Sequence, residues 1–175
     1  MHIEIKNERL VNFFNNNLKI NNIMKKIVVL FVAVFALGFA VNAQNALGVR
    51  GAFGNGTAAE LSFQKGLSDA NRLELDLGWH NFKDWGSYIN LTGIYQWYFN
   101  ISGGFGWYAG LGANAGLYTG NVDDSFGLGF DAQIGIEYKF DFPLQISFDF
   151  RPQWDLLGAA SGFGYGAALS LRYCF

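Results

Sequence analysis

Apolar and polar residues alternate with a period of two in about eight stretches between residues 45 and 175. The pattern is clearest in RLELDLGW, where Leu73, Leu75 and Leu77 alternate with Glu74 and Asp76. Successive side chains of a β-strand point to opposite faces, so each stretch predicts a strand with one apolar and one polar face. Clusters of Gly, Asn, Asp and Ser separate the stretches, and none shows a convincing helical period. The pattern predicts an all-β fold.

The alternating stretches follow one another without a linker or a second domain. They are 46–54, 58–65, 72–80, 88–99, 106–118, 127–140, 144–154 and 162–175. Antiparallel strands in sequence order can close into an up-and-down barrel, which removes the exposed edges of the sheet. We expect residues 44–175 to form one such barrel domain.

Two features indicate that the apolar face of this barrel points outward. The bulky apolar face would overfill the interior of an eight-stranded barrel, which is only wide enough for side chains to fill. The polar face carries most of the strand glycines, which are poor choices for a strand exposed to water: Gly48, Gly78, Gly110, Gly112, Gly116, Gly129, Gly135, Gly164 and Gly166. Bulky groups would then meet lipid, and the fold predicted is an eight-stranded antiparallel up-and-down transmembrane β-barrel.

Aromatic residues gather at the two ends of the expected strands. One set is Trp97, Tyr98, Phe99, Trp107, Tyr108, Tyr138, Phe140, Tyr173 and Phe175, and the other is Trp79, Trp85, Tyr88, Tyr118, Trp154 and Phe163. Amphipathic rings are enriched at the two membrane–water interfaces. Two such bands are typical of a membrane barrel.

Charged residues of both signs fall on the inward parity of the strands. They are Arg50, Glu60, Glu74, Asp76, Asp131, Glu137, Lys139, Asp149, Arg151 and Arg172. Because an isolated buried charge is very costly, we expect these groups to pair with one another or to stay hydrated. The favoured interpretation is a salt-bridge network that plugs the lumen, and a narrow, weakly cation-preferring water path is the alternative.

The segment before the barrel predicts a cleaved secretory signal peptide at 24–43. A basic start at 24–26 precedes the apolar run 27–40, and small residues follow at Val41 and Ala43. The apolar run is shorter than the roughly 20 residues that a membrane helix needs. We expect cleavage between Ala43 and Gln44.

Residues 1–23 precede a complete signal peptide that has its own methionine, Met24. They are rich in asparagine and show no clear amphipathic period. We interpret them as an over-extended start of the reading frame, and a genuine long leader is the alternative.

The charge of the expected barrel argues against a nucleic-acid partner. The whole chain has 12 basic and 14 acidic residues, but five of the basic and only two of the acidic ones lie before Gln44. The barrel is therefore acidic, and an acidic surface is a poor match for a phosphate backbone. Cys174 is the only cysteine, so an internal disulfide is excluded.

The last stretch keeps its alternation to the end of the sequence. Leu169, Leu171, Tyr173 and Phe175 share its apolar face, although chain termini are usually polar and frayed. Strand number, alternation, signal peptide and terminal Phe175 together make residues 45–175 resemble the small eight-stranded outer-membrane barrels of the OmpA/OmpX type. The resemblance implies an outer-membrane location of the Gram-negative type, with membrane lipid as a partner, and we expect a monomer.

In that family the barrel-assembly machinery reads a terminal aromatic residue and the apolar residues two and four places before it. Phe175, Tyr173 and Leu171 match these positions. The resemblance therefore implies that this triplet is an assembly signal.

No residue pattern identifies a catalytic, cofactor or metal site in the expected barrel. His80 is its only histidine, and Ser87 lies seven residues away. We expect a non-enzymatic outer-membrane barrel with a structural role and no cofactor. A narrow porin-like pore is one alternative. Another is surface binding or adhesion through exterior loops near 54–58, 80–87, 118–126 and 155–161.

The Asn-Gly pair at 55–56 is typical of a two-residue hairpin turn. Parity excludes that turn, because it would set Arg50 opposite Leu61 and send one of them to the wrong face. We predict a connection of three residues, or another odd number, that pairs Gly54 with Ala58 or adopts an equivalent register.

Overall fold

The computed structural model describes residues 45–82, 86–119, 126–158 and 161–175. The predicted signal peptide at 24–43 and the preceding segment 1–23 lie outside these ranges. Among the residues described, no helix has the length and apolar character needed to cross a membrane.

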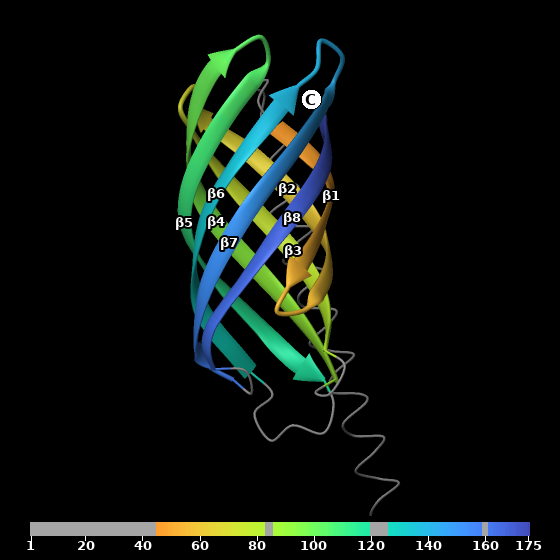
Figure 1. Cartoon of the computed structure of the whole chain (residues 1–175), viewed down its shortest axis with the longest axis vertical. Helices are drawn as coiled ribbons and strands as arrows, with labels where there is room; N and C mark the ends of the chain where they lie inside the picture. The colour runs from red at the N-terminus through yellow and green to blue at the C-terminus, as the bar shows by residue number, and fades with distance from the viewer. Residues whose placement is uncertain (1–44, 83–85, 120–125, 159–160) are drawn as a thin grey trace, which may run out of the picture. The chain divides into compact units, whose positions relative to one another are not determined.

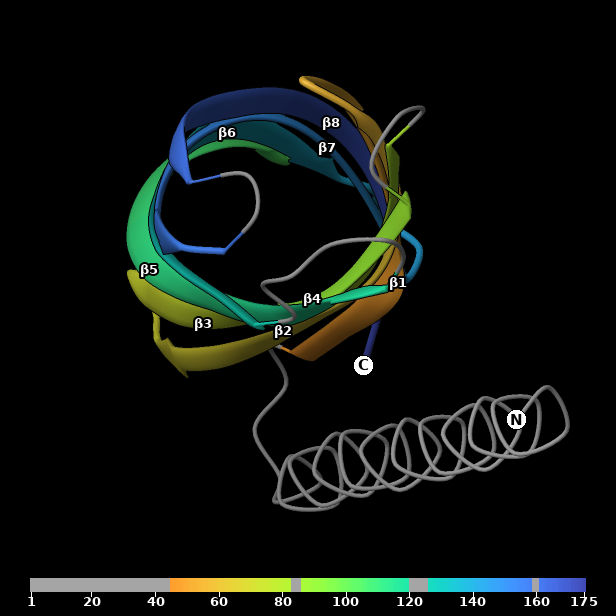
Figure 2. The ribbon, with the colours of Figure 1, turned by 90° about the horizontal axis from the view of Figure 1, so that it is seen from below.

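The described residues form a closed antiparallel β-barrel. Its strands are β1 (Asn45–Gly54), β2 (Thr57–Ser68), β3 (Asn71–Phe82), β4 (Gly86–Ser102), β5 (Phe105–Thr119), β6 (Phe126–Lys139), β7 (Leu144–Leu157) and β8 (Gly162–Cys174). Each strand pairs with the next in sequence, and β8 pairs with β1 (Figure 1). Viewed along its axis, the sheet forms a complete ring (Figure 2). The predicted eight-stranded up-and-down barrel is confirmed.

The barrel has two ends, which are named here by what they carry. At the terminal end β1 begins and β8 finishes, beside the β4–β5 and β6–β7 connections at the top of Figure 1. At the opposite end, called the hairpin end, lies the β1–β2 connection.

The first hairpin has the predicted parity. Phe53 pairs with Thr57, which leaves the three residues 54–56 between paired positions, and Arg50 faces Glu60 across the two strands. The connection has the expected three residues. It begins at Gly54, whereas the predicted pairing of Gly54 with Ala58 would begin it at Asn55. A pair of hydrogen bonds to β8 accounts for the difference. The Asn55 backbone N–H donates to the Tyr165 carbonyl at 3.2 Å, and the Asn55 side-chain oxygen accepts from the Tyr165 N–H at 2.6 Å.

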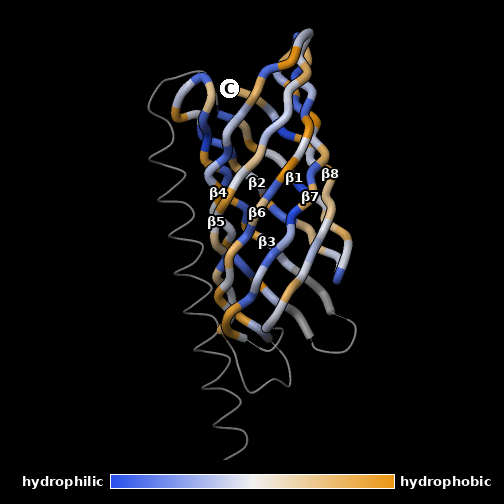
Figure 3. Tube along the Cα trace, turned by 60° about the vertical axis from the view of Figure 1, so that its left-hand side comes forward, coloured by the Kyte–Doolittle hydropathy of each residue, from blue (hydrophilic) through white to orange (hydrophobic). Residues whose placement is uncertain are grey.

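The two faces of the barrel wall have inverted polarity. Large apolar side chains point outward and are exposed, as in Trp79 at 63% and Ile134 at 55%, whereas Glu74 and Arg172 point inward and are 0% and 1% exposed. Hydrophobic and hydrophilic positions alternate along the strands in Figure 3. A water-soluble barrel has the opposite arrangement, so the fold is built for apolar surroundings.

Four tyrosines predicted to belong to the interfacial bands have inward parity instead, which is a correction: Tyr88, Tyr98, Tyr108 and Tyr118. Glycines on the same face leave room for their rings. A Cβ added to Gly106 would lie 2.4 Å from the Tyr98 hydroxyl oxygen, and one added to Gly135 would lie 2.5 Å from Tyr108 Cζ. The inward glycines therefore accommodate aromatic rings as well as polar groups.

The outward aromatic residues remain near the strand ends, where they contact one another. At the terminal end Phe99 stacks on Trp107 with ring centroids 4.3 Å apart, and Tyr138 meets Phe140 edge to face at 4.8 Å. At the hairpin end Trp154 meets Phe163 at 5.1 Å. The side chain of the predicted band member Trp85 lies outside the described residues.

Replacing Gly48 with alanine should lower the free energy of unfolding by about 1–3 kcal/mol, which is the usual cost of overpacking. The added Cβ would lie 1.9 Å from the Leu171 carbonyl oxygen, so β8 would have to shift. Gly51 is the matched control on the same strand, because a Cβ there meets nothing within 4 Å. Gly51→Ala should change stability by less than about 0.5 kcal/mol. Guanidinium unfolding in lipid vesicles measures both variants, and equal losses would contradict the crowding at Gly48.

Candidate functional site

The inward charged side chains form ion pairs across the barrel interior, beginning with Arg50 on β1. Its guanidinium lies 2.6 Å from a carboxylate oxygen of Glu60 on β2 and 2.6 Å from one of Asp149 on β7. A second bond, from Arg50 Nε to Asp149 at 3.2 Å, makes the contact with Asp149 bidentate. All three side chains are buried. Planar, bidentate pairing of this kind is the arrangement in which arginine binds a carboxylate most strongly.

Arg151 on β7 connects this group to the acidic residues of β3. It lies 3.6 Å from Glu60, 2.9 Å from Glu74 and 2.5 Å from Asp76. The strands β3 and β7 are not neighbours in the sheet, so these bonds run through the interior and not along the wall.

Glu74 accepts hydrogen bonds from four side chains. Arg172 and Gln64 donate to one oxygen at 2.9 and 2.7 Å, and Arg151 and Gln133 donate to the other, each at 2.9 Å. The donors come from β8, β2, β7 and β6. Arg172 is fixed further by the hydroxyl groups of Ser62 and Ser147. Glu74 is therefore the point at which most of the interior is joined.

Arg72 belongs to the same interior, although it is not among the charged residues predicted to line the lumen. Its guanidinium pairs with Glu137 on β6 and donates to Gln96 on β4, each at 2.5 Å. It also lies 5.1 and 4.7 Å from the ring centroids of Tyr98 and Tyr108. The signal that could have identified it is parity, because Arg72 lies two residues before Glu74 at the start of the same strand.

Amide side chains complete a closed ring of contacts inside the barrel. Gln96 donates to Gln133 at 2.5 Å, and Gln145 donates to both Glu137 and Gln64 at 2.9 and 3.1 Å. With the bonds described above, the ring returns to its start through Glu74, Gln133, Gln96, Arg72, Glu137, Gln145 and Gln64. Side chains from five strands thus span the interior.

Two of the predicted lumen residues lie at the margins of this network. Asp131 accepts a hydrogen bond from Asn114 at 2.9 Å and forms no ion pair with an arginine of the described residues. The ammonium of Lys139 lies 5.5 Å from the Tyr98 ring centroid, and within the described ranges no carboxylate pairs with it. These two residues share the inward parity but are not joined to Glu74 by the bonds above.

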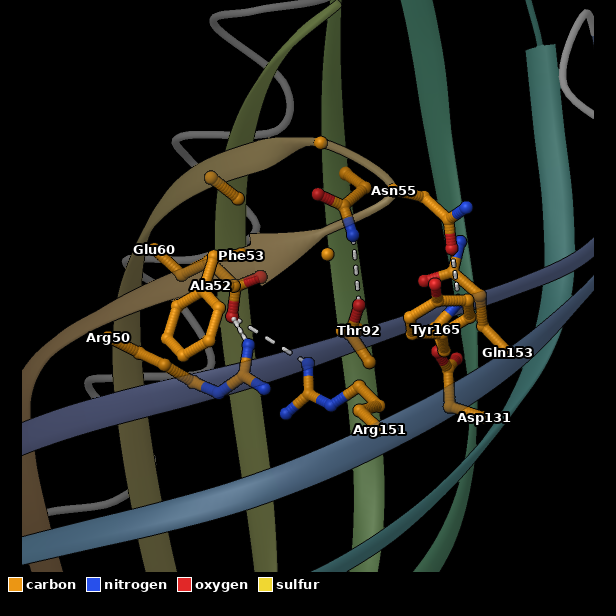
Figure 4. Close-up of a pocket in the computed structure, with 15 residues that line it drawn as sticks. Arg50, Ala52, Phe53, Asn55, Glu60, Thr92, Asp131, Arg151, Gln153 and Tyr165 are labelled. Carbon is orange, nitrogen blue, oxygen red and sulfur yellow. Dashed lines mark hydrogen bonds and ion pairs between the residues drawn. The ribbon is translucent and has the colours of Figure 1, made fainter.

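A small cavity lies at the hairpin end of the barrel, next to the ion pairs of Arg50 and Arg151 (Figure 4). Its volume is about 70 Å³, and Arg50 and Arg151 both point toward Glu60 in its wall. Arg151 Nε and Asn90 Oδ1, both on residues that line this cavity, have no protein hydrogen-bond partner. A polar space of this size can hold water, which would supply the missing partners.

The predicted assembly triplet lies on the outer face of the closing strand. Leu171, Tyr173 and Phe175 are about half exposed, and the rings of Tyr173 and Phe175 stack with centroids 6.3 Å apart. The Phe175 backbone exchanges two hydrogen bonds with Asn45, at 2.9 and 3.2 Å. The last residue therefore continues the seam between β8 and β1.

The described part of the chain brings together no metal-binding group of three or more His, Cys, Asp or Glu residues. The side chain of His80 lies outside the described residues. Cys174 is a free, half-buried thiol whose sulfur lies 3.8 Å from Gln145 Oε1. Charge pairing is thus the principal chemistry of the described interior.

No protein-family model matches the chain, and no curated protein matches it. Solved structures do match. The N-terminal β-barrel domain of OprF from Pseudomonas aeruginosa matches with a TM-score of 0.59 at 20% identity. The match covers 77% of this chain and 100% of the OprF domain. Neisserial surface protein A has a TM-score of 0.56 at 14% identity, over 76% of this chain and 96% of that one. The designed barrel TMB2.3 has a TM-score of 0.55 at 15% identity, over 78% and 98%. The chain therefore has the fold of the small outer-membrane β-barrels.

Proposed function

We propose that this protein is a non-enzymatic outer-membrane β-barrel with a structural role, whose charged lumen is closed to ions and solutes. The observation that carries the proposal is the set of side-chain bonds that cross the interior between strands that are not neighbours. The ring through Glu74 links β2, β3, β4, β6 and β7, and Arg50 and Arg172 add β1 and β8. An ion crossing this layer would have to separate buried ion pairs in a low-dielectric tube.

The proposed outer-membrane location is supported by the polarity of the barrel, by the segment that precedes it and by its fold. The outward face is apolar and bulky, the interior is polar, and the segment 24–43 has the pattern of a secretory signal. The fold is shared with OprF and with Neisserial surface protein A, a protein whose name places it at a surface. Transmembrane barrels combine an outer apolar band with a polar interior.

Glu74→Gln should lower the free energy of unfolding by about 3–5 kcal/mol, because removing one partner leaves buried charges without compensation. Arg172 would lose its described ion pair, and Arg151 would lose one of its carboxylates. Denaturant unfolding in vesicles measures the loss. Asp141→Asn removes the same charge at an exposed turn residue and should change stability by less than about 0.5 kcal/mol. A loss at Glu74 no larger than at Asp141 would argue against the network as a structural element.

In planar bilayers the unmodified protein should give no discrete conductance steps, because the ring through Glu74 and the ion pairs of Arg50, Arg151 and Arg172 cross the lumen. Current is recorded at symmetric salt, and then with a salt gradient if steps appear. Regular steps with a preference for cations would contradict the closed lumen and favour the narrow pore.

Ile134→Arg should destabilise the membrane-inserted barrel by about 2–4 kcal/mol, as expected for a cation facing the bilayer midplane. Ile134 is 55% exposed on the outer face of β6, so a polar interior cannot accommodate the new charge. Ile134→Leu is the matched control and should fold normally. The measurement is unfolding in vesicles, with the gel shift between boiled and unboiled protein as the test of folding. Equal stability of the two variants, with recovery in the soluble fraction, would contradict membrane insertion.

Parity places the neighbouring Gln133 on the inner face, where arginine would cost little only if space allowed. Gln133 is buried, donates to Glu74 and accepts from Gln96, so arginine there would break the ring. The contrast between the two faces is therefore best tested at Ile134 alone.

Phe175→Ala should reduce the amount of folded barrel per cell far more than Trp107→Ala, if the triplet Leu171, Tyr173 and Phe175 is read during assembly. Both residues are outward aromatics near the terminal end, 42% and 37% exposed, and the substitution at Phe175 leaves its backbone bonds to Asn45 possible. Folded protein is quantified by gel shift in cells that lack the periplasmic protease. Equal assembly of the two variants would reduce Phe175 to a packing residue.

A further inference from the structure

A second and larger cavity lies at the terminal end of the barrel. Its volume is about 600 Å³, and it is bounded by inward residues near the strand ends and by turn residues. Arg72, Tyr98, Lys139, Gln145 and Cys174 are among the residues that line it. This volume is within the range of cavities that bind drug-sized ligands.

The wall of this cavity carries one positive charge, on Lys139, that forms no ion pair with a carboxylate of the described residues. Arg72 is neutralised by Glu137, which lies 2.5 Å away and does not line the cavity. Lys139 has no carboxylate partner among the described residues, and its ammonium lies 5.5 Å from the Tyr98 ring. The lysine therefore differs from every arginine of the lumen, each of which has a carboxylate within 2.9 Å or less.

The remaining wall is polar and uncharged, apart from Asp69 at the exposed turn. Amide and hydroxyl groups come from Asn71, Asn100, Gln145 and Ser68, beside the small residues Ala46, Gly66 and Gly104. The bulky apolar residues of the same strands, such as Ile136, lie on the outer face. No Leu, Ile, Val or Phe side chain lines the cavity, so it offers an acyl chain no large aliphatic contact, whereas a hydroxylated or amide-bearing molecule would find donors and acceptors.

We propose that this cavity binds a soluble, polar ligand that carries one carboxylate or phosphate, with the anionic group placed against Lys139. A charge-assisted hydrogen bond to an ammonium group is among the stronger polar contacts, and the neutral wall would orient the rest of the ligand. This binding would not depend on whether the lumen conducts, because the cavity lies at its mouth.

Cys174 makes the proposal directly testable. It is the only cysteine of the chain, it lines the same cavity, and its thiol is half-buried. A bound ligand should therefore shield it from alkylation. The probes are glucuronate and glycerol 3-phosphate, with glucose and glycerol as their neutral counterparts, at an ionic strength matched with sodium chloride. The rate of iodoacetamide modification is followed by mass spectrometry on the full protein purified from membranes in detergent.

At least one of the two anionic probes should slow alkylation about fivefold or more at saturation, because ligand cavities enclose most of the ligand surface and leave little of the wall open. The neutral counterparts should have little effect. Lys139→Gln should raise the probe concentration for half protection about tenfold or more, the loss expected for a hydrogen bond to a charged group. Lys139→Arg should retain protection, since it keeps the charge.

Lys65→Gln is the matched control, because Lys65 lies on β2 near the same end but does not line the cavity. Protection is expressed as the ratio of rates with and without probe, which removes any change in the basal reactivity of the thiol, and folding of each variant is checked by gel shift. Equal protection by anionic and neutral probes, or full protection in Lys139→Gln, would overturn the proposal. The proposal would also be overturned if no soluble probe protected Cys174 from alkylation. This includes the outcome in which Cys174 is protected in nanodiscs of phosphatidylglycerol but not in nanodiscs of phosphatidylcholine, which would indicate a lipid headgroup instead of a soluble ligand.

Discussion

Every buried charge of the lumen has to find its partner inside the lumen, and the rest of the structure depends on this requirement. An isolated guanidinium or carboxylate in a low-dielectric interior would cost several kcal/mol or more. Glu74 meets the requirement for Arg151 and Arg172 at once, and Asp149 and Glu60 meet it for Arg50. Because these polar groups occupy much of the interior, most of the bulky apolar residues lie on the outer face, with Ile94 as a buried exception. The inverted polarity of the wall is thus a consequence of the network.

An apolar outer face in turn requires a wall without free backbone groups, since lipid offers no hydrogen bonds. The pairing of β1 with β8 removes the last edge, from Ala46 opposite Cys174 to Gly54 opposite Gly166. The two backbone bonds between Asn45 and Phe175 extend that seam to the final residue. Alternation that continues to Phe175 is therefore explained by closure alone, whatever reads the terminal aromatic residue during assembly.

Alternation was sufficient to predict the strands, their order and the inward parity of Arg50, Glu74 and Arg172, because all of these follow from a period of two. It was insufficient for contacts across the barrel, because those depend on how far each strand is staggered against the next. Arg72 was missed because it is the first residue of its alternating stretch, so the alternation can be seen only on its C-terminal side. The tyrosines were assigned to the outer bands by residue type, although Tyr98 and Tyr108 have the parity of Gln96 and Gly110. Parity places Gln133 on the inner face, but only the stagger of the strands brings it between Gln96 and Glu74.

The same network makes the two ends of the barrel chemically different. Among the described residues, a cavity of about 70 Å³ lies at the hairpin end and one of about 600 Å³ lies at the terminal end. The smaller cavity faces Arg50 and Arg151, but Glu60 and Asp131 also line it, so its charges are balanced locally. In the larger cavity Arg72 pairs with Glu137, which does not line it, and Lys139 forms no ion pair with a carboxylate of the described residues, although Asp69 lines the same cavity. A lysine at an open mouth stays hydrated when the cavity is empty, and the same ammonium is the group against which an anionic ligand would bind.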